Sequence, residues 1–146
     1  MTAKLFGKLP AHGDFVARGM SAAERDGLDA WLSASLADAR AKFEELFDEI
    51  YDYAQPWAGA GPGVVGAIAA SQDAAGRRFP VLLLCAHGDP VALIGDAIAE
   101  RWDADRLVEA AGDAPGGDIE RWWTDDCERL GPQPSDLIAA LIGDRA

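Results

Sequence analysis

Charged side chains gather in a short segment near the N-terminus that is rich in glycine and proline. Residues 6–19 have the sequence FGKLPAHGDFVARG, so that Lys8, His12 and Asp14 lie between two phenylalanines. The three glycines allow backbone angles that other residues avoid, and Pro10 fixes its own φ and keeps the preceding residue extended. We therefore expect a shaped loop rather than a helix, one that holds charged groups in place against an apolar core.

A second charged loop is expected between two apolar segments in the middle of the chain. Residues 71–78, SQDAAGRR, have the polar residues, the aspartate and the glycine that favour a turn between two strands. Together the two loops contain five charged groups: Lys8, Asp14, Asp73, Arg77 and Arg78. Their aromatic neighbours are Phe6, Phe15 and Phe79. If these three rings point inward, the charges lie beside one wall of the core, where they can pair with one another.

The pairing that we predict is between Asp14 and Arg77, within an ionic network that joins the two loops. Lys8 and Arg78 are expected to be more exposed than Asp14. A network that only fixes the loops is the first interpretation, a binding surface built on that network is the second, and catalysis is the third. If the pair is buried, removal of one partner costs about 3 to 5 kcal/mol because it leaves the other charge unpaired, whereas an exposed pair is worth under about 1 kcal/mol.

A catalytic alternative uses Ser71, His87 and Asp89 as a hydrolase triad, in which the histidine takes the proton of the serine hydroxyl. The sequence around Ser71 lacks the G-x-S-x-G turn that exposes a nucleophilic serine in one large class of hydrolases. A small hydrolase is therefore kept only as the alternative from another functional class.

A metal site is the second form of that alternative. The tetrapeptide Ala-His-Gly-Asp occurs at residues 11–14 and again at 86–89, and His12 with Asp14 could contribute two ligands. Transition-metal sites usually need three or four convergent ligands, whereas Gly-Asp pairs are common in turns. The more economical interpretation is two turns, so we expect neither a metal nor another cofactor.

A glycine pattern at residues 61–66, GPGVVG, matches the G-x-G-x-x-G of dinucleotide-binding loops. Here the pattern precedes a predicted strand instead of linking a strand to a helix, and Pro62 removes an N–H that would face a phosphate. We do not expect a nucleotide site.

Length and charge restrict the class of protein further. The chain has 146 residues, enough for one domain with a sizeable core, and its net charge is −12. This charge opposes binding to the phosphate backbone of nucleic acids. No apolar segment approaches the roughly 20 residues of a membrane-spanning helix, and the first residues lack the apolar core of a secretory signal. We expect a cytoplasmic protein that neither binds nucleic acid nor inserts into a membrane.

Local patterns predict the helix that follows the first loop. Ser21 and Glu24 have the spacing of a capping box, in which each side chain satisfies a free backbone N–H at a helix start. Apolar residues then recur every three or four positions as far as Ile50, which predicts a long amphipathic helix with one break near residues 37–41.

Two strands and four further helices are predicted after it. Residues 64–70 and 79–86 are the strands, and the second, FPVLLLCA, is apolar throughout, which indicates burial on both faces of a sheet. The helices are expected at residues 89–102, 103–111, 119–130 and 135–142. Because the strands fall in the first 90 residues and the helices follow, the sequence favours an α/β sandwich over a regular βαβ series.

The two loops also carry a resemblance. FGKLPAHGDFVARG, a following helix with Trp31, and the pattern S-x-D-x-x-G-R-x-F-P from Ser71 resemble the TagF (ImpM) family of type VI secretion-associated proteins over about residues 5–84. The family pattern falls on Gly7, Lys8, Pro10, Gly13, Asp14, Phe15, Ser71, Asp73, Gly76, Arg77, Phe79 and Pro80. These are the candidate interaction residues, and the family provides no catalytic residue to transfer.

The resemblance implies a fold and a function. The fold is a single-domain, three-layer αβα sandwich around a mixed, largely antiparallel sheet, with a motif-bearing part at about residues 5–84 and a helical tail at about 89–146. Members of the family look like cytoplasmic, post-translational repressors of secretion-system assembly. They act by binding the forkhead-associated scaffold protein, near the phosphatase of the threonine-phosphorylation pathway. We therefore expect a protein partner for this chain.

Overall fold

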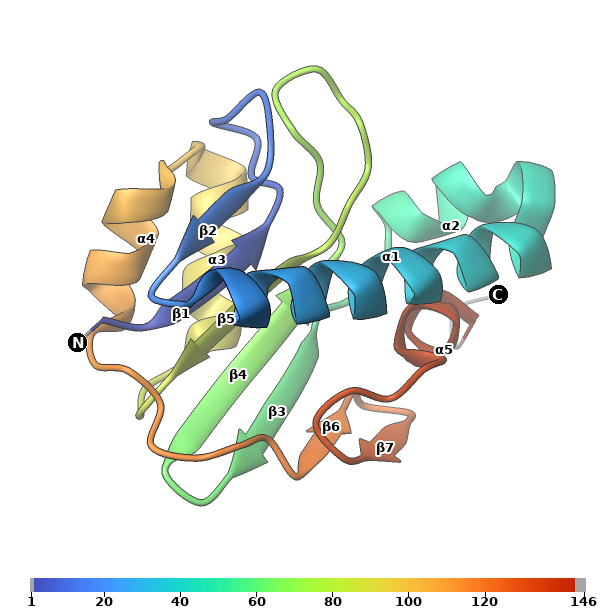
Figure 1. Ribbon diagram of the computed structural model, residues 1–146. Helices are drawn as coiled ribbons and strands as arrows, with labels where there is room; N and C mark the ends of the chain where they lie inside the picture. The colour runs from blue at the N-terminus through green and yellow to red at the C-terminus, as the bar shows by residue number, and fades with distance from the viewer. Residues whose placement is uncertain (1, 144–146) are drawn as a thin grey trace.

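A seven-stranded antiparallel sheet forms the middle layer of residues 2–143, the part of the chain that the computed structural model describes (Figure 1). Its strands are β1 (Lys4–Gly7), β2 (Val16–Arg18), β3 (Trp57–Gly61), β4 (Val64–Ala69), β5 (Val81–Cys85), β6 (Arg121–Trp123) and β7 (Glu128–Leu130). The strand order across the sheet is β2-β1-β5-β4-β3-β6-β7, and each neighbouring pair is antiparallel.

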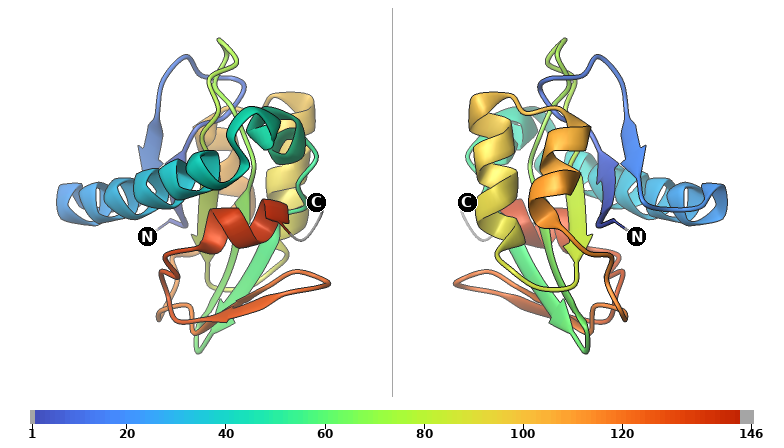
Figure 2. Two further views of the ribbon diagram at one scale, coloured as in Figure 1. Left: turned by 90° about the vertical axis from the view of Figure 1, so that its right-hand side faces the viewer. Right: turned by 90° about the vertical axis from the view of Figure 1, so that its left-hand side faces the viewer.

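Helices cover both faces of this sheet (Figures 1 and 2). They are α1 (Ala22–Phe43), the 3-10 turn η1 (Glu44–Leu46), α2 (Phe47–Asp52), α3 (Pro90–Glu100), α4 (Ala104–Ala111) and α5 (Leu137–Gly143). One core lies between the sheet and α1, α2 and α5, and a second lies between the sheet and α3 and α4. The predicted α/β sandwich is confirmed, with three layers. In the described part of the chain, no helix is long and apolar enough to cross a bilayer.

The apolar strand at the centre of the prediction is β5, which lies between β1 and β4. Leu82 and Leu84 face the α1 side, whereas Val81, Leu83 and Cys85 face α3 and α4. Because successive side chains of a strand point to opposite faces, an unbroken apolar run is what a doubly covered strand requires. The interpretation of this segment from sequence is confirmed.

The capping box at the start of α1 is also confirmed. The Ser21 hydroxyl accepts a hydrogen bond from the Glu24 N–H, at 3.1 Å, and the Glu24 carboxylate accepts one from the Ser21 N–H, at 3.4 Å. The break predicted near residues 37–41 is wrong, because it lies at η1 instead. Residues 37–41, ADARA, contain neither glycine nor proline and consist mainly of alanine and arginine, which are good helix formers, so nothing local ends the helix there. The chain turns only at Glu44, whose φ is +49°, and this turn lets Phe47 enter the core.

The predicted helix at residues 119–130 is wrong, because this segment forms the hairpin of β6 and β7. Ile119 and Trp122 are spaced as on a helix, yet burial follows the two-residue period of a strand: Arg121 is exposed and Trp122 is buried. A Cβ on Gly59 would lie 2.5 Å from the Trp122 ring. The missing side chain on β3 therefore makes room for the indole, and strands are not confined to the first 90 residues.

The remaining helices agree with the sequence. The Asp89 carboxylate accepts from the Ala92 N–H at the start of α3, with Pro90 in the first helical position, as expected for a cap. Asp103 caps α4 in the same way. The last helix begins at Leu137, two residues later than the predicted start.

Hydrogen exchange should distinguish the centre of the sheet from its edge. The amides of Val81–Cys85 are expected to be among the slowest to exchange, because β5 is paired on both sides and opens only near the global unfolding free energy. Glu128–Leu130 form β7, which lies at one edge of the sheet and pairs only with β6. Their amides should exchange much faster and serve as the internal comparison. Rapid exchange throughout Val81–Cys85 would contradict the central placement.

Candidate functional site

Two loops meet at one end of the sheet, above α1 in Figure 1. Residues 8–15 connect β1 to β2, and residues 70–80 connect β4 to β5. They are adjacent because Gly7 pairs with Val81 in the sheet. Gly7 has a φ of +132°, and a Cβ there would lie 2.1 Å from the Pro80 carbonyl oxygen, so only glycine allows this close approach.

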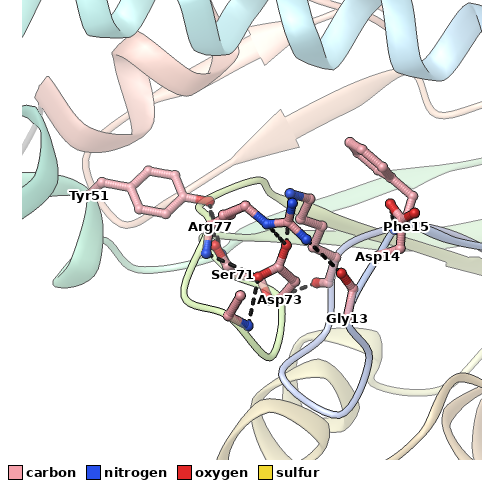
Figure 3. Close-up of polar contacts among 9 residues, drawn as sticks. Gly13, Asp14, Phe15, Tyr51, Ser71, Asp73 and Arg77 are labelled. Carbon is pink, nitrogen blue, oxygen red and sulfur yellow. Dashed lines mark hydrogen bonds and ion pairs between the residues drawn. The ribbon is translucent and has the colours of Figure 1, made fainter.

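The carboxylate of Asp73 is the centre of the contacts between the loops (Figure 3). Its Oδ1 accepts from the backbone N–H groups of Ala75, at 2.9 Å, and Arg77, at 3.0 Å. Its Oδ2 accepts from Lys8 Nζ, at 3.0 Å, and from Arg77 Nε, at 2.8 Å. The Asp73 side chain is fully buried. The carboxylate therefore shapes its own turn and also ties that turn to the first loop.

The electrostatics of this cluster keep Asp73 ionised. Burial by itself raises the pKa of Asp73, because a charged carboxylate loses its hydration. The hydrogen bonds from Lys8, from the N–H groups of Arg77 and Ala75, and from the Arg77 guanidinium outweigh that effect and hold the pKa well below its usual range. The carboxylate is thus a fixed negative charge and not a proton acceptor at neutral pH.

Ser71 and Tyr51 extend the cluster to the helical layer. The Ser71 hydroxyl donates to the Lys8 carbonyl at 2.7 Å. The Tyr51 hydroxyl donates to the Ser71 carbonyl at 3.0 Å and accepts from the Ser71 N–H at 2.9 Å. Burial raises the pKa of Tyr51 well above its ordinary value, so the hydroxyl stays protonated and can make both bonds. Through Tyr51, α2 is fixed to the loops.

Sequence reasoning missed Tyr51. A usable signal was present, because Tyr51 lies four residues after Phe47, on the same side of a helix, and a buried tyrosine hydroxyl needs a polar partner. The partner is the backbone of Ser71, which no local pattern reveals.

The predicted pairing of Asp14 with Arg77 is wrong. Arg77 bonds to Asp73 and to the Gly13 carbonyl, at 2.7 Å, while the Asp14 carboxylate is exposed and accepts from the Phe15 N–H, at 2.7 Å. Asp73 takes the position predicted for Asp14 because its turn directs it toward the core. The expected exposures are reversed as well, since Lys8 is buried and Asp14 is not.

The aromatic cluster is only partly internal. Phe6 and Phe79 are buried, but Phe15 is 45% exposed, so the condition that all three rings point inward is not met by Phe15. Its ring centroid lies 4.8 Å from that of Phe79 and 6.0 Å from that of Phe6. Lys8 Nζ lies 4.9 Å from the same ring. Phe15 therefore projects from a well-supported base. Arg77, which is bonded to the Gly13 carbonyl of the same loop, keeps 63% of its side chain exposed.

Arg78 is half-buried and belongs to another contact. Its guanidinium bonds to both carboxylate oxygens of Asp52, at 2.8 and 2.7 Å, and lies 3.4 Å from Asp48. This pair lowers the pKa of Asp52 through the hydrogen bond from Arg78. It adds a second connection between α2 and the loop that precedes β5.

The hydrolase triad is not assembled. Ser71 lies before the start of β5, where its carbonyl accepts from the Phe79 N–H, and His87 lies beyond the other end of that strand. The five residues of β5 alone span roughly 16 Å. Asp89 caps α3. The Ser71 hydroxyl is buried and bonded to the Lys8 carbonyl, so it is held as a structural donor.

The metal alternative finds no support in the structure either. Within residues 2–143, no group of three histidine, cysteine or acidic side chains is placed to hold a metal ion. His12 Nε2 accepts from the Ala104 N–H at 2.9 Å, so its lone pair serves the first turn of α4. The glycines at 61–66 likewise have a packing role. A Cβ on Gly61 would lie 2.1 Å from the Asp118 carbonyl oxygen, in the segment that leads to β6.

Replacement of Tyr51 tests its structural role. Tyr51→Phe should lower the free energy of unfolding by about 1 to 3 kcal/mol, because the buried Ser71 N–H loses its partner and the Ser71 carbonyl keeps only the bond from the Phe79 N–H. Urea denaturation measures the change. Tyr53→Phe is the matched control, since Tyr53 is 76% exposed and its loss should change stability by under about 0.5 kcal/mol. Equal effects of the two variants would contradict the assignment.

The ionised state of Asp73 predicts a pH dependence. Because its folded pKa is depressed, its contribution to stability is present above the unfolded value, near 4, and is lost as the pH falls below that value toward the folded pKa. The difference in urea midpoint between the wild type and Asp73→Asn should therefore be largest at pH 6 and shrink toward pH 3. Asp14→Asn, at an exposed position in the first loop, is the control and should lie close to the wild type at pH 6. If the difference in urea midpoint between the wild type and Asp73→Asn grows as the pH falls, the ionised state assigned to Asp73 is wrong.

Comparison with known proteins gives one family and one fold. A family model described as the TagF N-terminal domain, type VI secretion system-associated, matches residues 4–121, which include both loops, Tyr51 and the Asp73 cluster. The crystal structure of PA0076 from Pseudomonas aeruginosa PAO1 is similar with a TM-score of 0.58 and 22% sequence identity. The similarity covers 97% of this chain and 77% of that chain, and at this identity it concerns the fold alone. No curated protein matches the chain.

Proposed function

The chain belongs to the TagF family of type VI secretion system-associated proteins, and we propose that it is a non-enzymatic regulator that represses assembly of the secretion system by binding a protein partner. The proposed partner is the forkhead-associated scaffold that the family resemblance implies. The proposed site is the loop surface, defined as the exposed side chains of Asp14, Phe15 and Arg77.

The observation that carries the proposal is an exposed Phe15 on the loop whose Gly13 carbonyl binds Arg77, an arginine that the buried Asp73 also holds in place. Aromatic and arginine side chains dominate the energetics of protein interfaces. Arg77 Nε is bound to Asp73 and its Nη2 to the Gly13 carbonyl, so the guanidinium is already ordered before a partner arrives. A preorganised side chain loses less conformational entropy on binding, which favours affinity.

Binding is a better account of this end of the sheet than turnover. A nucleophile or general base needs a polar atom that is free to meet a substrate. The polar side chains nearest the core here, Ser71, Asp73 and Tyr51, are buried and engaged in bonds to the loops themselves. They support the proposal because they form a rigid base beneath the loop surface. The side chains of the loop surface itself reach solvent, so they are available to contact a protein partner.

Titration of the repressor against its scaffold tests the mechanism. Secretion should fall in proportion as this protein approaches the concentration of the scaffold, and additional scaffold should restore it, because each repressor molecule occupies one site. Phe15→Ala should lose repression, while Leu46→Ala removes an apolar side chain of similar exposure elsewhere and should retain it. Circular dichroism and melting confirm that both variants are folded. Full repression by trace amounts of protein, insensitive to added scaffold, would overturn the proposal.

A further inference from the structure

A separate recess lies on the α1 side of the sheet, away from the loop surface. Its volume is about 220 Å³, and it is lined by residues of α1, of β5 and of the segment that leads from α4 to β6. Figure 1 shows how these three parts of the chain are arranged. The apolar lining of the recess includes Leu28, Trp31, Leu82, Leu84, Ile119 and Trp122. It contains none of the residues that form the loop surface.

The floor of the recess includes a half-buried leucine of an interior strand. Leu84 is paired with Gly66 across the ladder, and a Cβ on Gly66 would lie 2.7 Å from Leu84 Cδ2 and 3.1 Å from Ile119 Cδ1, so these two side chains pack over the glycine. Above Leu84, α1 carries Gly27 at the edge of the recess. No atom lies within 4 Å of a Cβ placed on Gly27, so no close contact requires glycine there. Glycine is unfavourable inside a helix, and its effect at this position is to leave the recess open.

The size of the recess restricts its occupant. Pockets for cofactors and other drug-sized ligands usually measure about 300 to 1,000 Å³. At about 220 Å³ this space is smaller, and it suits a single bulky apolar side chain. Side chains that enter such apolar pockets are the anchors that dominate protein interfaces.

The edge of the recess indicates the charge of the partner. Lys4 and Glu24 form an ion pair there, which leaves their charges balanced. Asp118 also lines the recess, is exposed, and has no ion-pair partner among the described residues. The net charge of the whole chain is −12. A basic segment is therefore favoured over an acidic one.

We propose that this recess, bounded by Gly27, Leu84 and Trp122, receives one bulky apolar side chain from a basic segment of a protein partner. The inference does not depend on the function proposed for the loop surface. A partner can engage either surface without the other, since the two share no residue.

Nuclear magnetic resonance with a peptide probe tests the site. The probe is a short peptide with one tryptophan between lysines, and the comparison peptide has alanine in place of tryptophan. Methyl signals of Leu28, Leu84 and Ile119 should shift and saturate with the tryptophan peptide, and the alanine peptide should bind at least tenfold more weakly. Binding should weaken as salt rises, because screening reduces the attraction of exposed charges. Asp118→Asn should reduce that salt dependence.

Two helix glycines provide a matched pair of variants. Gly27→Met places a side chain over the recess and should weaken binding of the tryptophan peptide at least tenfold. Gly95→Met makes the same change in α3, on the opposite face of the sheet, also where no atom lies within 4 Å of the new Cβ, and should leave binding unchanged. Both substitutions remove a glycine from a helix, so both proteins should remain folded. Leu84→Phe, which fills the recess from its floor, is a second variant and should act like Gly27→Met.

Three outcomes would overturn the inference. The first is the absence of saturable shifts at Leu84 and Ile119 with the tryptophan peptide. The second is binding that Gly27→Met and Leu84→Phe leave unchanged. The third is equally tight binding of free indole, which would assign the recess to a small molecule and not to a basic protein segment. Because the assay measures peptide binding and not secretion, none of these results bears on the repressor proposal.

Discussion

The buried carboxylate of Asp73 is the interaction on which the loop end of the molecule depends. A charge removed from water is tolerated only where charged and hydrogen-bonding partners replace its hydration, and here the donors come from both loops. Lys8 is equally constrained, because it is buried with its ammonium between Asp73 and the Phe15 ring. Neither loop can therefore move away without leaving an uncompensated charge behind. The exposed side chains of these loops are held on a rigid base for the same reason.

The same cluster explains the course of the long helical segment. After α1 crosses the sheet, the chain turns at η1 so that Phe47 and Tyr51 stack and enter the core, and Tyr51 then reaches Ser71. A straight continuation of α1 would leave the Ser71 N–H without the Tyr51 hydroxyl as its acceptor. Arg78 adds a second connection by its bonds to Asp52. The position of the break is thus set by contacts between distant segments and not by the helix sequence around residues 37–41.

Features that depend on neighbours in sequence were predictable, and features that depend on distant partners were not. The capping box at Ser21 follows from the spacing of two residues, and strand β5, apolar on both faces, follows from an unbroken apolar run. Trp122 lies in a strand because Gly59 leaves space for its ring, which no helical or strand period encodes. The choice of Asp73 over Asp14 is similar. Both are aspartates in glycine-containing loops, and only the direction of the turn decides which carboxylate is buried.

The residues that carry the family pattern separate into two groups in the structure. Lys8, Ser71 and Asp73 are buried and bonded to one another or to the backbone of the loops. Asp14, Phe15 and Arg77 are exposed. A purely structural motif would have no need of an aromatic ring 45% open to water, because that exposure forgoes part of the hydrophobic stabilisation that burial provides. A buried frame that holds an exposed aromatic and a fixed guanidinium has the physical properties of a recognition surface, since its ordering is complete before any partner binds.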